Sequence, residues 1–238
     1  MSLSIQSRRV GDVIVLACRG RIVEGDESAM LSQELGRLVP DDPCIVLDLS
    51  GIEFLDSSGI GLLVRLLNRT RAAHGDLKLC ALPDRVRELL RITKLAGVFD
   101  AHAAESDAIA AFYREAPPAS AQGRFSAEVL CVDASADVRA YVCEALRQSG
   151  YGVMTAGNLP DALALLRASR PKAVIMSAAL RAARDTWTAE TFNAEAGGLA
   201  LIELPASFSS EDAGEAGHRL LEQIHAAMGP RDGTVRTA

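Results

Sequence analysis

The chain has 238 residues, a formal net charge of −6, and a composition that is 49% hydrophobic but only 4% aromatic. This length is enough for two ordinary domains, and aliphatic side chains must fill most of their cores. The acidic balance argues against a general nucleic-acid-binding protein, which normally presents a basic face. No run of about 18 apolar residues occurs, so we expect no membrane-spanning segment.

Strand-like and helix-like patterns alternate along the first half of the sequence, which predicts an α/β layer structure. In chain order we expect strands at 4–8 and 13–19, a helix at 27–38, a strand at 44–49, a link at 50–55, a helix at 60–73, a strand at 77–82, a helix that begins at Asp84, a short strand at 98–99 and a helix at 107–113.

The clearest break in the pattern follows Arg114. Pro117 and Pro118 prevent a helix from continuing there, and the neighbouring residues are small or polar. We therefore predict two domains with a linker and a flexible tail, at 1–115, 116–124, 125–228 and 229–238.

The second half repeats the alternation and predicts a doubly wound parallel sheet. In chain order we expect a strand at 129–132, a helix at 136–148, a strand at 151–156, a helix at 160–169, strands at 173–176 and 199–204, and a helix at 218–228.

Five cysteines are present, an odd number without any C-x-x-C spacing. Most of them lie in apolar runs, so we expect buried free thiols in a reducing, cytoplasmic setting. The first residues also lack the apolar core of a signal peptide. The four histidines form no ligand cluster, and no phosphate-binding glycine loop occurs, so we expect no metal, no cofactor and no enzymatic activity.

The most informative motif is Asp56-Ser57-Ser58-Gly59, which lies between a predicted strand and a predicted helix. Helix N-termini carry free N–H groups and a positive dipole end, so a phosphate can be held there. One interpretation is that a serine of this motif is a modification switch. The alternative is an ordinary helix N-cap, a position that favours Ser, Asp and Gly.

The sequence around this motif resembles the STAS domain of anti-sigma-factor antagonists. The resemblance covers about 110 residues. The matching segments are 45–50, 54–63, 75–80, 86–90 and 95–99. It implies a mixed sheet with helices in the first domain. It also implies that an anti-sigma factor, itself a serine kinase, phosphorylates Ser57, and that only the unmodified form binds this partner.

The same resemblance implies a contact surface around Ser57. The residues expected there are Asp56, Ser58, Gly59, Ile60, Gly61 and Leu62. Ser58 would share the cap, Gly59 would let a partner backbone approach, and Ile60 could instead belong to the core. The family often shows Gly-Glu-Leu-Asp after its second strand. Here Glu24 or Asp26 replaces that acidic feature, or the feature is absent.

The second half is similar to response-regulator receiver domains, a flavodoxin-like fold, in the segments 129–133, 137–139 and 150–156. That family uses an acidic pair for Mg²⁺, a phosphate-accepting aspartate and a late lysine. Here the pair is reduced to Asp133, and Ser177 occupies the place of the acceptor. No lysine follows Lys172. We therefore predict a truncated, degenerate receiver that cannot be phosphorylated and that mediates a homodimer or binds a second protein. The alternative is a remnant domain without a present role.

Two other functions remain open at this point. The chain could be a non-switching scaffold of a signalling complex, with Ser57 silent. It could also be a small-ligand sensor, although no residue pattern favours that function. None of these hypotheses includes direct contact with nucleic acid or a membrane.

Overall fold

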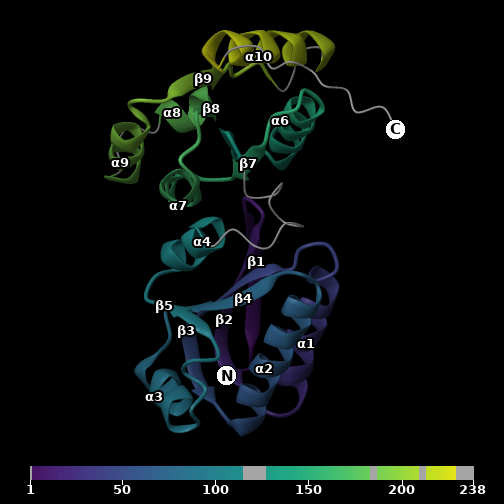
Figure 1. Ribbon diagram of the computed structural model, residues 1–238, viewed down its shortest axis with the longest axis vertical. Coiled ribbons are helices and arrows are strands. Elements are labelled where there is room, and N and C mark those ends of the chain that lie inside the picture. Colours follow the sequence, from purple (N-terminus) through teal and green to yellow (C-terminus); the bar gives the residue numbers. More distant parts are fainter. Residues whose placement is uncertain (1, 115–126, 183–186, 209–212, 229–238) are drawn as a thin grey trace. The chain divides into compact units, whose positions relative to one another are not determined.

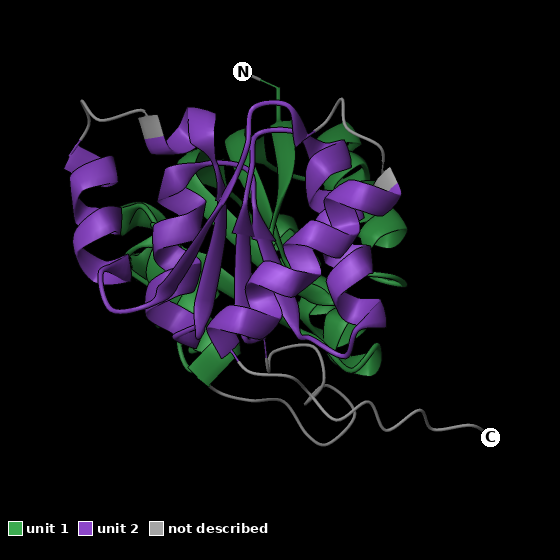
Figure 2. Ribbon diagram, turned by 90° about the horizontal axis from the view of Figure 1, so that it is seen from above, with its two compact units in different colours: residues 1–121 green, residues 122–238 purple. Residues whose placement is uncertain are grey.

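The computed structural model describes residues 2–114, 127–182, 187–208 and 213–228. The chain divides into two compact units, Met1–Ala121 and Gln122–Ala238 (Figure 2). The predicted linker at 116–124 and the predicted tail at 229–238 lie outside the described residues.

The first unit is built on a five-stranded mixed sheet of order β1-β2-β3-β4-β5 (Figure 1). Its strands are β1 (Ser4–Val10), β2 (Val13–Ile22), β3 (Cys44–Leu55), β4 (Asp76–Cys80) and β5 (Asp100–His102). β1 runs antiparallel to β2, and each later pair in this sheet is parallel. Its helices are α1 (Asp26–Leu38), α2 (Ser57–Ala72), α3 (Asp84–Ile92) and α4 (Glu105–Arg114).

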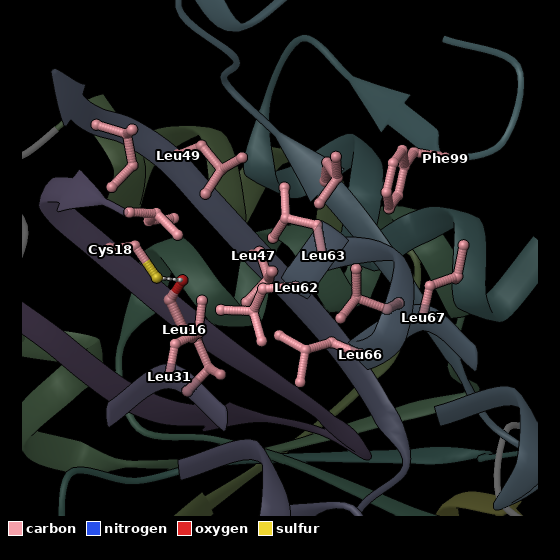
Figure 3. Packing of buried hydrophobic residues seen from close by; sticks show 14 of the residues in the cluster. Leu16, Cys18, Leu31, Leu47, Leu49, Leu62, Leu63, Leu66, Leu67 and Phe99 are labelled. Atoms are coloured by element: carbon pink, nitrogen blue, oxygen red, sulfur yellow. Dashed lines mark hydrogen bonds between the residues drawn. The ribbon is translucent and has the colours of Figure 1, made fainter. Parts of the chain in front are cut away.

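The core of this unit lies between one face of the sheet and the helices α1, α2 and α3 (Figure 3). Alternate residues of the strands, such as Leu16, Leu47 and Leu79, point into it and are fully buried. α2 contributes the largest helical share because apolar residues recur at helical spacing, as in Leu63, Leu66 and Leu67. α4 covers the opposite face with buried residues that include Ile109 and Phe112.

Two predicted boundaries in the first unit are wrong, because β2 continues to Ile22 rather than ending at residue 19 and α2 begins at Ser57 rather than at residue 60. Two other segments differ in kind. The predicted link at 50–55 is strand, because β3 continues to Leu55 beside β2, with register shifts between Ala17 and Arg19 and between Gly20 and Arg21. The predicted strand at 98–99 is a turn. Phe99 is buried in the core instead, and the strand β5 follows it at 100–102.

The second unit has a four-stranded parallel sheet of order β7-β6-β8-β9. Its strands are β6 (Val129–Val132), β7 (Val153–Ala156), β8 (Ala173–Ser177) and β9 (Ala200–Leu204). Its helices are α6 (Ala136–Gln148), α7 (Leu159–Ser169), α8 (Ala178–Ala182), α9 (Trp187–Ala196) and α10 (Ala213–Met228). α6 and α10 cover one face of this sheet, and α7 and α9 lie on the other.

The second unit departs from the sequence prediction mainly between β8 and β9. The helices α8 and α9 were not predicted, and α10 begins at Ala213 rather than at residue 218. After β9 the chain does not add a strand within the described residues 205–208. Phe208 instead packs against Tyr141 of α6, with ring centroids 6.0 Å apart.

Four of the five cysteines are buried, and all five are free thiols, as predicted. Burial raises the pKa of Cys18, Cys80 and Cys131 to about 12. The carboxylate of Asp48 adds to this effect at Cys18 and Cys80. These thiols are therefore protonated at neutral pH and are poor nucleophiles.

Candidate functional site

The motif around Ser57 lies where the parallel strands β2 and β3 end together. Ile22 and Leu55 are register partners at these ends. The chain then turns into α2, and the N–H of Asp56 donates to the carbonyl of Ile22 at 3.4 Å. The motif is therefore fixed by the sheet on one side and by the helix on the other.

Asp56 is the N-cap of α2. Its Oδ1 accepts a hydrogen bond from the N–H of Gly59 at 2.7 Å, and its backbone is extended, as caps require. Its Oδ2 accepts a second bond from the N–H of Glu24 at 3.3 Å. One carboxylate thus caps the helix and holds the loop between β2 and α1. The structure assigns the cap to Asp56 and not to either serine, which corrects the expectation that Ser58 shares it.

The two serines occupy the first two positions of α2. Ser57 is exposed, whereas Ser58 is half-buried. N–H groups in the first turn have no acceptor within the helix, and the dipole is positive there. The hydroxyl of Ser57 is therefore accessible to another protein, and it lies where a bound phosphate would be favourable.

The next residues of the expected contact surface divide into buried and accessible positions. Ile60 is 5% exposed and Leu62 is 1% exposed, so their side chains belong to the core. Gly59 is also buried, and a Cβ there would lie 2.5 Å from the carbonyl oxygen of Ile22. The close approach that Gly59 permits is therefore made by this chain's own strand. Gly61 is half-exposed, and a Cβ added to it would have Arg65 Nη1 as its nearest neighbour, at 3.8 Å.

An aromatic residue beside the motif was not predicted as part of the site. Phe54 is 49% exposed near the end of β3, and the guanidinium carbon of Arg21 lies 5.4 Å from its ring centroid. Arg21 and Phe54 are register partners across β2 and β3. An exposed aromatic residue three positions before Ser57 adds an apolar element to this surface. The sequence signal was the pair Phe54-Leu55, of which only Leu55 fits in the core.

The acidic residues considered for this surface lie in the β2–α1 loop and the first turn of α1. Glu24 reaches Asp56 through its backbone N–H, as described above. Asp26 begins α1, where a carboxylate is favourable to the helix dipole. The loop is further tied by the hydroxyl of Ser28, which donates to the carbonyl of Val23 at 2.5 Å.

A second polar cluster lies on the α4 face of the sheet. The ammonium of Lys78 is almost fully buried, forms an ion pair with Asp100, and lies 5.0 Å from the ring centroid of Phe112. Nε2 of His102 is 3.0 Å from the other oxygen of Asp100. Burial opposes ionisation of Asp100, but the hydrogen bonds from Lys78 and His102 outweigh it and lower the pKa of this carboxyl group. The cluster fixes β5 to β4.

In the second unit, Asp133 and Ser177 lie at neighbouring strand ends. Val132 and Met176 are register partners, and the two residues follow them directly. Asp133 is 8% exposed, and its Oδ1 accepts from the N–H of Ser135 at 2.7 Å. Within the described residues, no group of three or more His, Cys, Asp or Glu side chains could hold a metal ion.

Sequence reasoning missed the role of Arg139 at this edge. Its Nη1 donates to the carbonyl of Asp133 at 2.5 Å and to that of Ala134 at 2.9 Å. A Cβ on Gly157 would lie 3.3 Å from the same Nη1, so the loop after β7 also borders this guanidinium. A fixed positive charge therefore borders the carboxyl ends of β6 and β7.

Comparison with known proteins gives matches to the first unit. Residues 4–108 match the family model described as STAS domain. BtrV of Bordetella bronchiseptica, which is named as an anti-sigma factor antagonist, is 28% identical over 107 residues, covering 44% of this chain and 92% of BtrV. In the part of the chain that the structure describes, no helix is long and apolar enough to cross a membrane.

Solved structures of anti-sigma factor antagonists also resemble the first unit. An anti-sigma factor antagonist from Mycobacterium paratuberculosis is 26% identical with a TM-score of 0.42, and the match covers 46% of this chain and 93% of that one. A STAS domain protein from Planctomyces limnophilus is 27% identical with a TM-score of 0.40, and the match covers 45% of this chain and 96% of that one. The residues matched by the STAS-domain model span all five strands of the first sheet, so the first unit is similar to STAS domains and to anti-sigma factor antagonists along its whole sheet.

Proposed function

We propose that this protein is an anti-sigma-factor antagonist that works by partner switching and has no catalytic activity of its own. Its unmodified form binds an anti-sigma factor that is also a serine kinase. Phosphorylation of Ser57 by that kinase ends the binding. The observation that carries the proposal is that Ser57 is exposed on the first turn of α2 while Asp56 provides the cap.

This arrangement suits a switch because the serine has no structural task in the helix. A phosphoryl group adds about −1.5 to −2 charges and three strong acceptor oxygens. The N-terminus of α2 favours a negative group electrostatically, so modification does not require the helix to unwind. The new charge instead changes the surface shared by Asp56, Phe54 and the β2–α1 loop.

The required energetic effect on binding is modest. A partner surface that packs against Phe54 or faces Asp56 would have to desolvate the phosphate or bring it close to other carboxylates. A loss of about 2.8 kcal/mol weakens an association about a hundredfold. One phosphoryl group at the centre of a protein interface is sufficient for a change of this size.

We further propose that the second unit is a truncated receiver-like domain that no longer accepts phosphate and instead mediates protein association. The order β7-β6-β8-β9 supports this, because flavodoxin-like sheets begin with the same arrangement of strands. The hydroxyl of Ser177 cannot form an acyl phosphate. Arg139 already supplies a positive charge beside Asp133, which disfavours a bound divalent cation.

The test of the switch uses the full chain, its cognate anti-sigma kinase and ATP. Intact mass should show one added phosphate, which Ser57→Ala abolishes and Ser58→Ala retains. Ser57→Asp should weaken binding to the kinase, measured by calorimetry, whereas Ser58→Asp should weaken it less. Binding without any phosphorylation would favour the scaffold function. Phosphate that persists in Ser57→Ala would contradict the assigned residue.

The test of the second unit uses acetyl phosphate and Mg²⁺ as a small phosphate donor. We expect no acid-labile phosphate on residues 122–238. Labelling at Asp133 would contradict the proposal that this unit is a degenerate receiver.

A further inference from the structure

The strand β9 is the open edge of the second sheet. It pairs with β8, and no other strand of the described residues lies beside it. The chain that follows β9 turns onto the sheet's α6 face, where Phe208 contacts Tyr141 and where Leu220 of α10 packs in the same cluster as Ile202. The segment after β9 therefore leads away from this edge.

Two residues of β9 present their backbone groups outward. The N–H of Ala200 donates to the carbonyl of Lys172, at the β8 side, at 3.3 Å. In an extended strand successive residues direct their N–H and C=O groups to opposite sides. Leu201 and Glu203 therefore direct both of their backbone groups to the open edge, which is a template for another strand.

The side chains at this edge favour association. Among the described residues of the second unit, the large exposed apolar side chains are Trp187, at 74% exposed, and Leu201, at 37%. Leu201 lies on β9 itself. Glu203 is the charged residue that would normally discourage strand addition. Nη1 of Arg181 lies 2.6 Å from its Oε2, so its charge is compensated within the same chain.

The other sheet edges in the described residues are protected. β1 carries two arginines, Arg8 and Arg9, and it has no large exposed apolar side chain. β5 has only three residues. β7 is buried at three of its four positions. Among the edge strands of the described residues, β9 is the one that combines five residues with a large exposed apolar side chain.

We propose that β9 pairs antiparallel with β9 of a second copy of this chain, joining two four-stranded sheets across a two-fold axis at Ile202. This inference rests on the association role proposed for the second unit and is independent of the Ser57 switch. The register follows from the outward residues. Centring on Ile202 places Leu201 opposite Glu203 of the second copy in two hydrogen-bonded pairs.

Other registers are poorer. Centring on Leu201 leaves one such pair instead of two. Centring on Glu203 also leaves one pair and places the two glutamates opposite each other, which is unfavourable. The Ile202 register keeps each Glu203 beside its own Arg181 and places an apolar side chain next to that ion pair. The contact is isologous and closed, so it stops at a dimer.

The first experiment removes the outward N–H of Leu201. Leu201→Pro deletes a donor that the β8–β9 ladder does not use, and proline is tolerated on an edge strand in this orientation. Leu201→Thr is the matched control, because it keeps the N–H and a strand-forming side chain. Sedimentation equilibrium of the full chain should give a dimer for the wild type, a dimer for Leu201→Thr that dissociates up to about tenfold more readily, and a monomer for Leu201→Pro.

The second experiment does not depend on the proline variant folding. Leu201→Cys combined with Glu203→Cys places two pairs of thiols at hydrogen-bonded positions, where Cα atoms are about 5.5 Å apart and a disulfide can form. Leu201→Cys alone leaves the thiols on a diagonal, at about 7–8 Å, and should cross-link poorly. Mild oxidation followed by non-reducing electrophoresis reports the linked dimer against the wild-type background.

The possible results distinguish a failure of the proposed β9 surface from a failure of the association role proposed for the second unit. Suppose that the wild type is a dimer, that Leu201→Pro does not dissociate it, and that the double cysteine variant forms no cross-linked dimer. The β9 surface would then be wrong, whereas the association role would stand. A monomeric wild type that also binds no other protein through residues 122–238 would overturn both. Neither result bears on phosphorylation at Ser57.

Discussion

The cap assignment makes a quantitative prediction for Asp56→Ala. Loss of an N-cap typically costs about 1 kcal/mol, within about 0.5–2 kcal/mol. Asp56 also accepts the N–H of Glu24 at 3.3 Å, a longer and weaker bond than that to Gly59 at 2.7 Å. We therefore expect Asp56→Ala to lower the free energy of unfolding of the first unit by about 1–2 kcal/mol. Urea unfolding followed by far-UV circular dichroism measures this change.

Two variants at and beside this position serve as controls. Asp56→Asn keeps an oxygen acceptor and loses only the charge next to the helix dipole, so it should cost less, about 0.3–1 kcal/mol. Ser57→Ala removes an exposed hydroxyl that does not cap the helix, and it should stay within about 0.5 kcal/mol of the wild type. If Ser57→Ala destabilised the unit as much as Asp56→Ala, the serine would have a structural role and the argument for a free switch would fail.

Two further predictions concern packing and pH. Gly59→Ala places a methyl group 2.5 Å from the carbonyl oxygen of Ile22 and should lower the free energy of unfolding by about 1–3 kcal/mol. The control Gly61→Ala has Arg65 Nη1 as its nearest neighbour at 3.8 Å and should be neutral or stabilising by up to about 1 kcal/mol. Equal effects of the two variants in the same urea assay would contradict the packing at Gly59. Because the folded-state pKa of Asp100 lies below its ordinary value, its contribution to stability is present above about pH 3.9 and is lost as the pH falls through the lowered pKa. Lys78→Met should make the fall in stability below that pH shallower than in the wild type, and parallel curves would show that the ion pair does not set the pKa.

The strands at the centre of both sheets could be predicted from the sequence because their pattern is strong and local. Continuous apolar runs such as 45–47 and 129–132 are buried on both faces, and central parallel strands require this. The helix after Asp56 was predictable for a similar reason, because one stripe of leucines recurs every three or four residues.

The boundaries that failed depend on contacts distant in sequence. Residues 50–55 contain Ser50, Gly51 and Glu53, a composition typical of a loop, yet they extend β3 because β2 continues beside them with two register shifts. Residues 98–99 have strand-like side chains, but Phe99 packs in the core from a turn. The helix α9 was missed because the amphipathic signal of its sequence is weak and its burial rests on a few residues such as Phe192.

The sequence identified the motif of the candidate site, but it did not show which residue caps the helix and which is available for modification. The motif identified the junction of strand and helix. It could not decide which of three polar residues caps α2, since Ser and Asp are comparable caps and the choice depends on backbone geometry. The pairing of Arg21 with Phe54 and the contacts of Arg139 also required the structure, because these residues meet across strands or loops.

Because Asp56 caps α2 and Ser57 does not, the proposed switch can work in only one of two ways. If a serine capped α2, phosphorylation would change the capping group itself, so the hydrogen bonds at the start of the helix would rearrange with each modification. Because Asp56 holds the cap and the β2–α1 loop together, α2 can stay folded when Ser57 is modified. The proposed switch therefore changes the charge of a rigid surface. Amide hydrogen exchange in the first turn of α2 should be nearly equal before and after phosphorylation, whereas binding to the kinase should not.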